Sequence, residues 1–197
     1  VLLLAAAPWW AGRGDLRMLV EIYTYVGLAQ MWCLLAGYGG LVSIGQQAFV
    51  GLGGYMLFAL AVLAGLHPVA ALILAGVIAA IVAVPTALVA FRLQGAYFAI
   101  GTWVIAEVFR LCFAQIHALG GGSGMSLPAE IVRGIASNVS SRESLIYWLA
   151  LALALASIGM VFLLLRSRWG LAMTAIRDRE PASESLGVET YKTKLVV

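Results

Sequence analysis

The chain has 197 residues, of which 63% are apolar and only 11% are charged. A soluble domain is typically ~25% charged, and so few charges cannot cover a surface that faces water. Together with a mean hydropathy of +1.00, this excludes a soluble globular domain and predicts an all-α, polytopic bundle of transmembrane helices. The net charge of +3 does not indicate nucleic-acid binding, because the basic residues lie mostly between the apolar runs.

Apolar segments close to the ~20 residues that a membrane-spanning helix needs recur along the chain. The first run is incomplete, and another begins at Leu195. We therefore expect a piece of a longer protein, truncated at one or both ends, with residues 1–197 forming part of a single transmembrane domain. The spans are expected at about 1–10, 19–37, 41–64, 69–91, 97–116 and 145–165.

Basic residues between the spans predict the orientation, because cytoplasmic loops are rich in Lys and Arg. Alternating spans put seven of them on the side of residues 166–190 and four on the other, so we expect residues 166–190 in the cytoplasm and residues 117–144 outside. The glycine run at 120–124 lacks the lysine and the strand-to-helix context of a phosphate-binding loop. No other ATP-binding motif occurs, so no cofactor is expected on this chain.

The stretch 37–55 is unusually rich in glycine for a span and carries three polar side chains, Ser43, Gln46 and Gln47. Small residues let helix backbones approach closely, and buried amides would then bond across helices. Alternatively, the glycines let the helix start late or break, and the stretch lines a solute path. Both readings stay open at this point.

Glu107 and Arg110 lie inside the fifth span, three residues apart, and so share one helix face. An unpaired charge near the centre of a bilayer costs at least ~2.5–3.5 kcal/mol on insertion scales. The two side chains are therefore expected either to form a structural ion pair or to face a wet solute path.

The segment 167–187 differs from the spans because it is short, amphipathic and dense in charge of both signs. Pro181 suits the first turn of a helix and Gly187 a helix end, so two short cytoplasmic helices are predicted. The acidic residues would be repelled by anionic lipids, which favours a protein partner over the membrane surface.

Three blocks of the sequence resemble permease subunits of the branched-chain amino acid class of ABC importers. They are the glycine-rich stretch 37–55, the segment 93–100 with Glu107, Arg110 and the following glycines, and the segment 167–187. The chain departs from the family pattern at Leu171, where arginine is frequent, and at Gln46, where histidine is frequent. Urea and short-amide permeases share the same blocks, so the solute stays open.

The resemblance implies a transport subunit of a prokaryotic inner membrane, without an ATPase site of its own. Its partners would be two cytoplasmic ATPases that bind the ATP, a second permease expected to be non-identical, an external solute-binding protein and the lipid bilayer. The third block would couple the permease to the ATPases. The coupling candidates are Arg177, Asp178, Glu180, Ala182, Glu184 and Gly187, and the candidate solute path comprises Ser43, Gln46, Gln47, Glu107 and Arg110.

Two rival interpretations assign the chain no ATPase partner. An ion-driven secondary transporter would account for the broken span and for Glu107, but it leaves the charged segment 167–187 unexplained. A structural or channel-like membrane protein is the other. A membrane enzyme is disfavoured, because neither paired carboxylates, metal-spaced histidines nor a nucleophile–base arrangement is found in the sequence.

Overall fold

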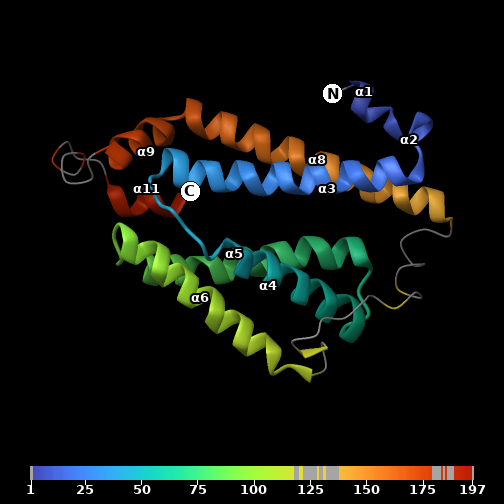
Figure 1. Ribbon diagram of the computed structural model, residues 1–197, viewed down its shortest axis with the longest axis horizontal. Coiled ribbons are helices and arrows are strands. Elements are labelled where there is room, and N and C mark those ends of the chain that lie inside the picture. The colour runs from blue at the N-terminus through green and yellow to red at the C-terminus, as the bar shows by residue number, and fades with distance from the viewer. Residues whose placement is uncertain are drawn as a thin grey trace. The chain divides into compact units, whose positions relative to one another are not determined.

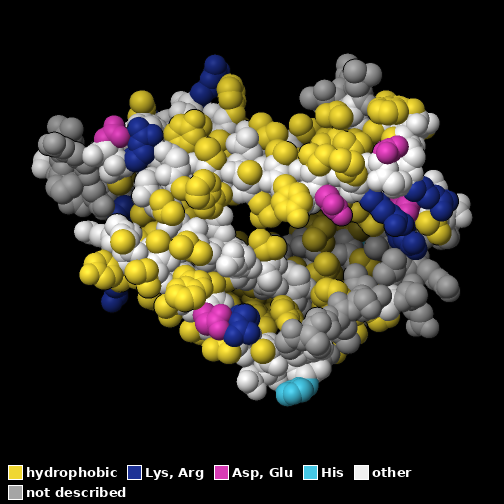
Figure 2. Space-filling view, viewed as in Figure 1, with side chains coloured by type: hydrophobic (Ala, Val, Ile, Leu, Met, Phe, Trp, Pro, Cys, Tyr) yellow, Lys and Arg dark blue, Asp and Glu magenta, His cyan; other side chains and the backbone are white. Residues whose placement is uncertain are grey.

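A computed structural model of the chain describes residues 2–117, 120–121, 128, 131, 138–178, 183, 185 and 189–196. The described residues are almost entirely helical and contain no strand. Five of the helices within them are long and apolar enough to cross a membrane. The all-α class predicted from composition is therefore confirmed. Apolar side chains are spread widely over the visible face, and charged ones are sparse (Figure 2), as expected of a protein that faces lipid.

The helices group into two compact units, Val1–Gly40 with Ala136–Val197, and Leu41–Ile135. In the first unit, α3 (Arg13–Trp32) continues into the π-helical η1 (Cys33–Tyr38). This continuous element lies beside α8 (Val139–Arg166), as Figure 1 shows. The short helices α1 (Leu2–Ala5) and α2 (Ala7–Trp10) precede it. Among the described residues after α8 are the helices α9 (Arg168–Asp178) and α11 (Thr190–Val196).

A buried tyrosine pair joins α3 to α8. The hydroxyl groups of Tyr23 and Tyr147 lie 3.0 Å apart, and the Tyr147 hydroxyl also donates to the carbonyl oxygen of Leu4 at 2.6 Å. Tyr147 has no exposed surface, so these bonds satisfy a hydroxyl that would otherwise be costly to bury. The surrounding core consists of Ala7, Leu16, Tyr23, Tyr147, Leu151 and Ala154.

The two long helices of this unit run in the same direction. Arg17 pairs with Glu143 at 2.8 Å near the start of each helix, and Leu34 packs with Val161 near the end of each. Successive spans alternate in direction, so the first and the fifth of the candidate spans, α3 and α8, must run in the same direction across a membrane. Arg13 and Arg17 thus lie at one end of the helix pair, where both pair with Glu143. Helix α9 lies at the other end, as Figure 1 shows.

The second unit contains α4 (Gln46–Phe58) with the π-helical η2 (Ala59–Leu63), α5 (Pro68–Ala90) and α6 (Ala96–Ala114). Helix α4 packs against both α5 and α6. It runs in the same direction as α6, because Phe49 lies beside Phe109 and Tyr55 stacks on Phe113 at 4.7 Å.

The helix bounds depart from the hydropathy pattern in four places. Helix α8 begins at Val139 rather than near Leu145, inside the stretch expected to be an external loop. The first apolar run, 1–10, is divided at Ala6 into two four-residue helices, with Pro8 in the first turn of the second. Helix α3 begins at Arg13 rather than near Leu19. At this earlier start, the Gly12 amide donates a hydrogen bond to the Asp15 carboxylate. The span expected from residue 41 becomes helical only at Gln46, so the late start anticipated for a glycine-rich span is present.

Candidate functional site

Helix α9 is held against the end of α8 by a tight turn at Ser167. The Ser167 hydroxyl donates to the carbonyl oxygen of Leu164 at 2.6 Å and accepts from the amide of Trp169 at 3.2 Å. A Cβ atom at Gly170 would collide with the backbone of Leu165. Glycine is therefore required at position 170 for the chain to fold back directly after the span.

One face of α9 is buried in the first unit. Met173 and Ile176 are 1% and 5% exposed, and Met173 packs with Leu34 and Val161 in a small core that η1 and α8 share. The opposite face is open, since Leu171 is 74% exposed. This amphipathic distribution fixes α9 to two spanning helices and leaves a surface free for a partner.

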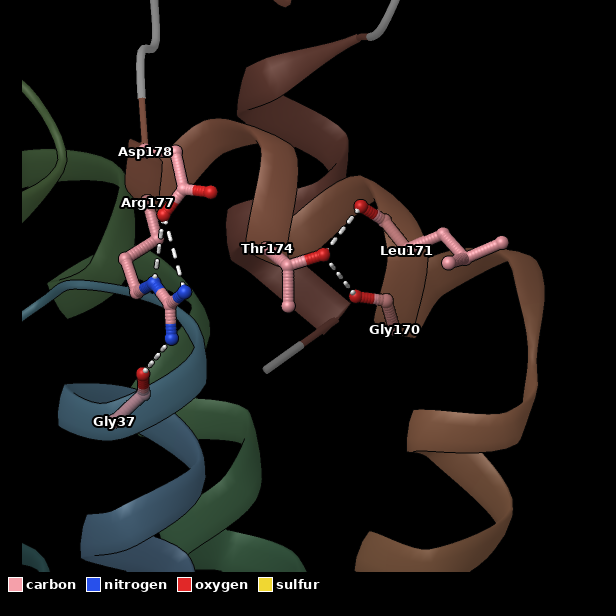
Figure 3. A network of polar contacts seen from close by, with 6 residues as sticks. All are labelled: Gly37, Gly170, Leu171, Thr174, Arg177 and Asp178. Atoms are coloured by element: carbon pink, nitrogen blue, oxygen red, sulfur yellow. Dashed lines mark hydrogen bonds and ion pairs between the residues drawn. The ribbon is translucent and has the colours of Figure 1, made fainter.

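Arg177 ties the end of α9 to the end of η1, as Figure 3 shows. Its Nη1 atom donates to the carbonyl oxygen of Gly37 at 3.0 Å, while its Nε atom donates to the Asp178 carboxylate at 3.1 Å. The backbone of Gly40 lies directly against Arg177 with a φ of +67°, a conformation that favours glycine. A guanidinium at the C-terminal end of a helix also interacts favourably with the helix dipole.

The structure therefore places two of the six predicted coupling residues. Arg177 and Asp178 form an ion pair at the end of α9, with side chains 42% and 70% exposed. Arg177 also makes an inward contact, to the carbonyl oxygen of Gly37, that no sequence pattern predicts. Glu180, Ala182, Glu184 and Gly187 lie outside the described residues, so their coupling role stays a prediction, as does most of the second short helix expected there.

The start of α4 is pressed against the middle of α6. The amide of Ile44 donates to the Thr102 hydroxyl at 3.2 Å, and a Cβ atom at Gly45 would collide with the Thr102 carbonyl oxygen. Ser43 is buried beside this contact, at 9% exposed, and Gln46 opens the helix. The sequence analysis offers close packing through glycine and a late helix start as alternative interpretations of the stretch 37–55. Both occur here.

A groove of about 300 Å³ between α4 and α6 gathers the other three candidate solute-path residues, Gln47, Glu107 and Arg110. Glu107 accepts hydrogen bonds from the Nε and Nη2 atoms of Arg110 at 2.9 and 2.5 Å. Both side chains stay open, at 45% and 65% exposed. Ser43 and Gln46 do not line this groove.

The groove also has an apolar lining, which the sequence analysis does not predict. It includes Tyr55 on α4 and Trp103, Phe109 and Phe113 on α6. Trp103, Glu107 and Arg110 follow one another at intervals of four and three, so a helical projection of α6 could have placed Trp103 on the charged face. Among the described residues, no group of three or more His, Cys, Asp or Glu residues could hold a metal ion.

Comparison with known proteins decides the family. Residues 16–197 match the family described as branched-chain amino acid transport system / permease component. The chain belongs to this family. The family consists of transport components rather than enzymes, and with the five apolar helices it makes the chain a multi-pass protein of the inner membrane.

Two curated permeases of the family are similar along nearly the whole chain. The chain is 30% identical over 220 aligned positions to the high-affinity branched-chain amino acid transport system permease protein LivM of Escherichia coli (strain K12), covering 99% of this chain and 51% of that protein. It is 29% identical, with the same coverage, to the LivM protein of Salmonella typhimurium (strain LT2). This permease chain thus spans about half the length of these relatives. No solved structure matches it.

Proposed function

We propose that the chain belongs to a membrane-spanning permease subunit of an ATP-driven importer, which moves branched-chain or other hydrophobic amino acids into the cytoplasm. In this proposal, two cytoplasmic ATPases bind the ATP, and this chain binds none. A second, non-identical permease completes the pore. A solute-binding protein outside the membrane delivers the amino acid.

The anchoring of α9 is the observation that carries the proposal. Closure of an ATPase can move membrane helices only by pushing on an element that is joined firmly to them. Helix α9 follows the last described span, α8, buries Met173 against η1 and α8, and bonds through Arg177 to the end of η1. A push on its open face would therefore reach two spanning helices together.

The ion-driven carrier remains the second candidate, because two features of the second unit favour it. The chain before Gln46 is not helical at the level of Thr102, and the neighbouring helix carries a Glu–Arg pair. Broken helices and charges within the membrane are common in secondary transporters. Such a carrier has no use for an ATPase partner, which separates the two functions.

Purification of the full-length protein from its native membrane in mild detergent tests the proposal. The expected result is co-purification of an ATPase and a second permease in stoichiometric amounts. Uptake competition between leucine and urea in the reconstituted complex would then separate the two solute classes of the family. A protein that purifies without any ATPase would contradict the proposal and favour the ion-driven carrier.

Crosslinking can locate the ATPase contact. Cys33 and Cys112 are free and exposed, so both are first replaced by alanine. Leu171→Cys on the open face of α9 should then crosslink to the ATPase, whereas Leu163→Cys on α8, 70% exposed within a span, should not. An equal yield at the two positions would argue against α9 as the contact.

A further inference from the structure

The groove between α4 and α6 is poorly suited to contact with lipid. Glu107 and Arg110 are about half exposed, and they lie on α6, a helix apolar enough to span a membrane. Charges in contact with hydrocarbon are expensive, so such residues face water or protein. In the assembled permease, we therefore expect this face of α6 to line an aqueous cavity or an internal contact.

The groove presents one charge of each sign beside an apolar wall. Glu107 supplies the anion and Arg110 the cation, while Trp103 and Phe109 supply aromatic surface. A free amino acid with an aliphatic side chain has the complementary set, namely one carboxylate, one ammonium group and one apolar chain. Urea carries no charge and needs none of these features.

The ion pair leaves hydrogen-bonding capacity for such a ligand. Arg110 uses Nε and Nη2 on Glu107, which leaves its Nη1 donors for a carboxylate. Each oxygen of Glu107 accepts one bond from Arg110 and can accept another from an ammonium group. The side chain of Gln47, which can donate and accept, lines the same groove from α4.

The space for the ligand exists because position 51 is glycine. Gln47, Gly51 and Tyr55 are four residues apart and line the groove from one face of α4. A Cβ atom at Gly51 would meet nothing within 4 Å. Tyr55 is fixed by its stacking on Phe113 and by donating a hydrogen bond to the Gly121 carbonyl oxygen at 2.8 Å.

We infer that this groove binds a free aliphatic α-amino acid as its zwitterion, with Arg110 holding the carboxylate and Glu107 the ammonium group. The inference rests on the proposed function for its solute class, but it adds a defined site within the membrane. Selection of the solute is then made by the permease as well as by the solute-binding protein. The volume of about 300 Å³ is in the lower range for small-molecule sites.

The test measures binding of tritiated leucine to the full permease–ATPase complex in nanodiscs, without the solute-binding protein. Gly51→Leu fills the groove and should weaken leucine binding by about tenfold or more. Gly53→Leu is the matched control, because Gly53 lies on the same helix, also has open space around it and does not line the groove. It should bind within about twofold of the unaltered complex.

Competition by two leucine analogues tests the charge assignment. In the unaltered complex, 4-methylpentanoate, which lacks the ammonium group, and isopentylamine, which lacks the carboxylate, should compete poorly. Glu107→Gln should weaken leucine binding and improve competition by 4-methylpentanoate, because the repelling anion is gone. A purely structural role of Glu107 would not produce this change in selectivity.

Uptake measured on the same complex, with the solute-binding protein added, separates the two proposals. Normal leucine uptake with unchanged leucine binding in Gly51→Leu would contradict the assignment of the groove as the leucine site, without contradicting the proposed importer function. Normal uptake without detectable leucine binding to the unaltered complex would overturn it too. Absence of ATP-dependent leucine uptake in the unaltered complex would instead overturn the proposed function, and the assigned ligand with it.

Discussion

The guanidinium of Arg177 donates a hydrogen bond to the carbonyl oxygen of Gly37, 3.0 Å away and 140 positions earlier in the chain. The bond joins the last turn of α9 to the π-helical end of η1. The Gly37 carbonyl oxygen lies in the last turn of this helix, where carbonyl groups have no partner within the helix. In the proposed importer, movement of an ATPase against α9 would be transmitted through this contact to η1 and the helix α3 that precedes it.

Charge reversal at this contact should uncouple the importer. In Arg177→Glu, the carbonyl oxygen of Gly37 would face a carboxylate instead of a donor. A partly exposed charged hydrogen bond contributes about 1 kcal/mol, which is a factor of about five in the equilibrium between the bonded and unbonded states. Leucine uptake per ATP hydrolysed should therefore fall by up to about fivefold. Membrane insertion should be unchanged, because Arg177 lies outside the spans.

The control for this prediction makes the same charge change at the other end of α9. The control variant is Arg168→Glu. Arg168 is the first residue of the same helix, and the bond to η1 is made by Arg177 at the other end. Uptake and ATP hydrolysis by both variants would be measured in proteoliposomes. An Arg177→Glu complex that couples as well as the unaltered one would contradict the role assigned to the bond.

The contact between Gly45 and Thr102 predicts an asymmetric response to alanine. Gly45→Ala would drive a methyl group into the backbone of α6, and overpacking of this kind costs about 1–3 kcal/mol. Gly53→Ala has open space and improves helix propensity by about 1 kcal/mol. Thermal unfolding in detergent should show a lower midpoint for Gly45→Ala and an equal or higher one for Gly53→Ala. Equal midpoints for the two would exclude the close approach.

Some of these features could be predicted from sequence and others could not, for a physical reason. Hydropathy locates the long helices, because burial in lipid acts on each segment separately. Local spacing likewise pairs Glu107 with Arg110, three residues apart. The start of α4 at Gln46 depends instead on the fit of Gly45 against Thr102, which are 57 positions apart in the chain.

In both candidate sites, the sequence indicates single residues but not the contacts that they make with distant segments. The segment 167–187 predicts that Arg177 docks a partner, and nothing near it in sequence indicates its bond to Gly37. Likewise, Gln47 joins Glu107 only because α4 and α6 run side by side. Contacts between distant segments depend on packing, which periodicity and composition do not encode.

Removal of one hydroxyl should measure how strongly Tyr147 holds α3 and α1 to α8. Tyr147→Phe loses the bonds to Tyr23 and to the Leu4 carbonyl, and it leaves buried polar groups without their partner. The expected cost is about 1–3 kcal/mol, seen as a lower unfolding midpoint in detergent. Tyr25→Phe, on the same helix pair but 70% exposed, should leave the midpoint unchanged. A similar midpoint for both variants would show that the buried bonds contribute little.

Membrane insertion of α6 and transport, measured on the same variants, together separate the two roles considered for Glu107 and Arg110. Arg110→Leu alone leaves the Glu107 carboxylate without its partner, which should disfavour insertion by about 2.5–3.5 kcal/mol if the pair lies deep in the bilayer. The double variant, with leucine at both positions, should insert at least as well as the unaltered helix. A glycosylation reporter in microsomes measures both.

Transport by the double variant then completes the argument. A structural ion pair can be exchanged for well-packed apolar residues with little loss, so a merely structural role predicts leucine uptake close to normal once insertion is restored. A solute-binding role predicts that the double variant inserts but does not transport, because the groove has lost both charges that would hold a zwitterion. Restored insertion together with restored uptake would assign the pair to structure alone.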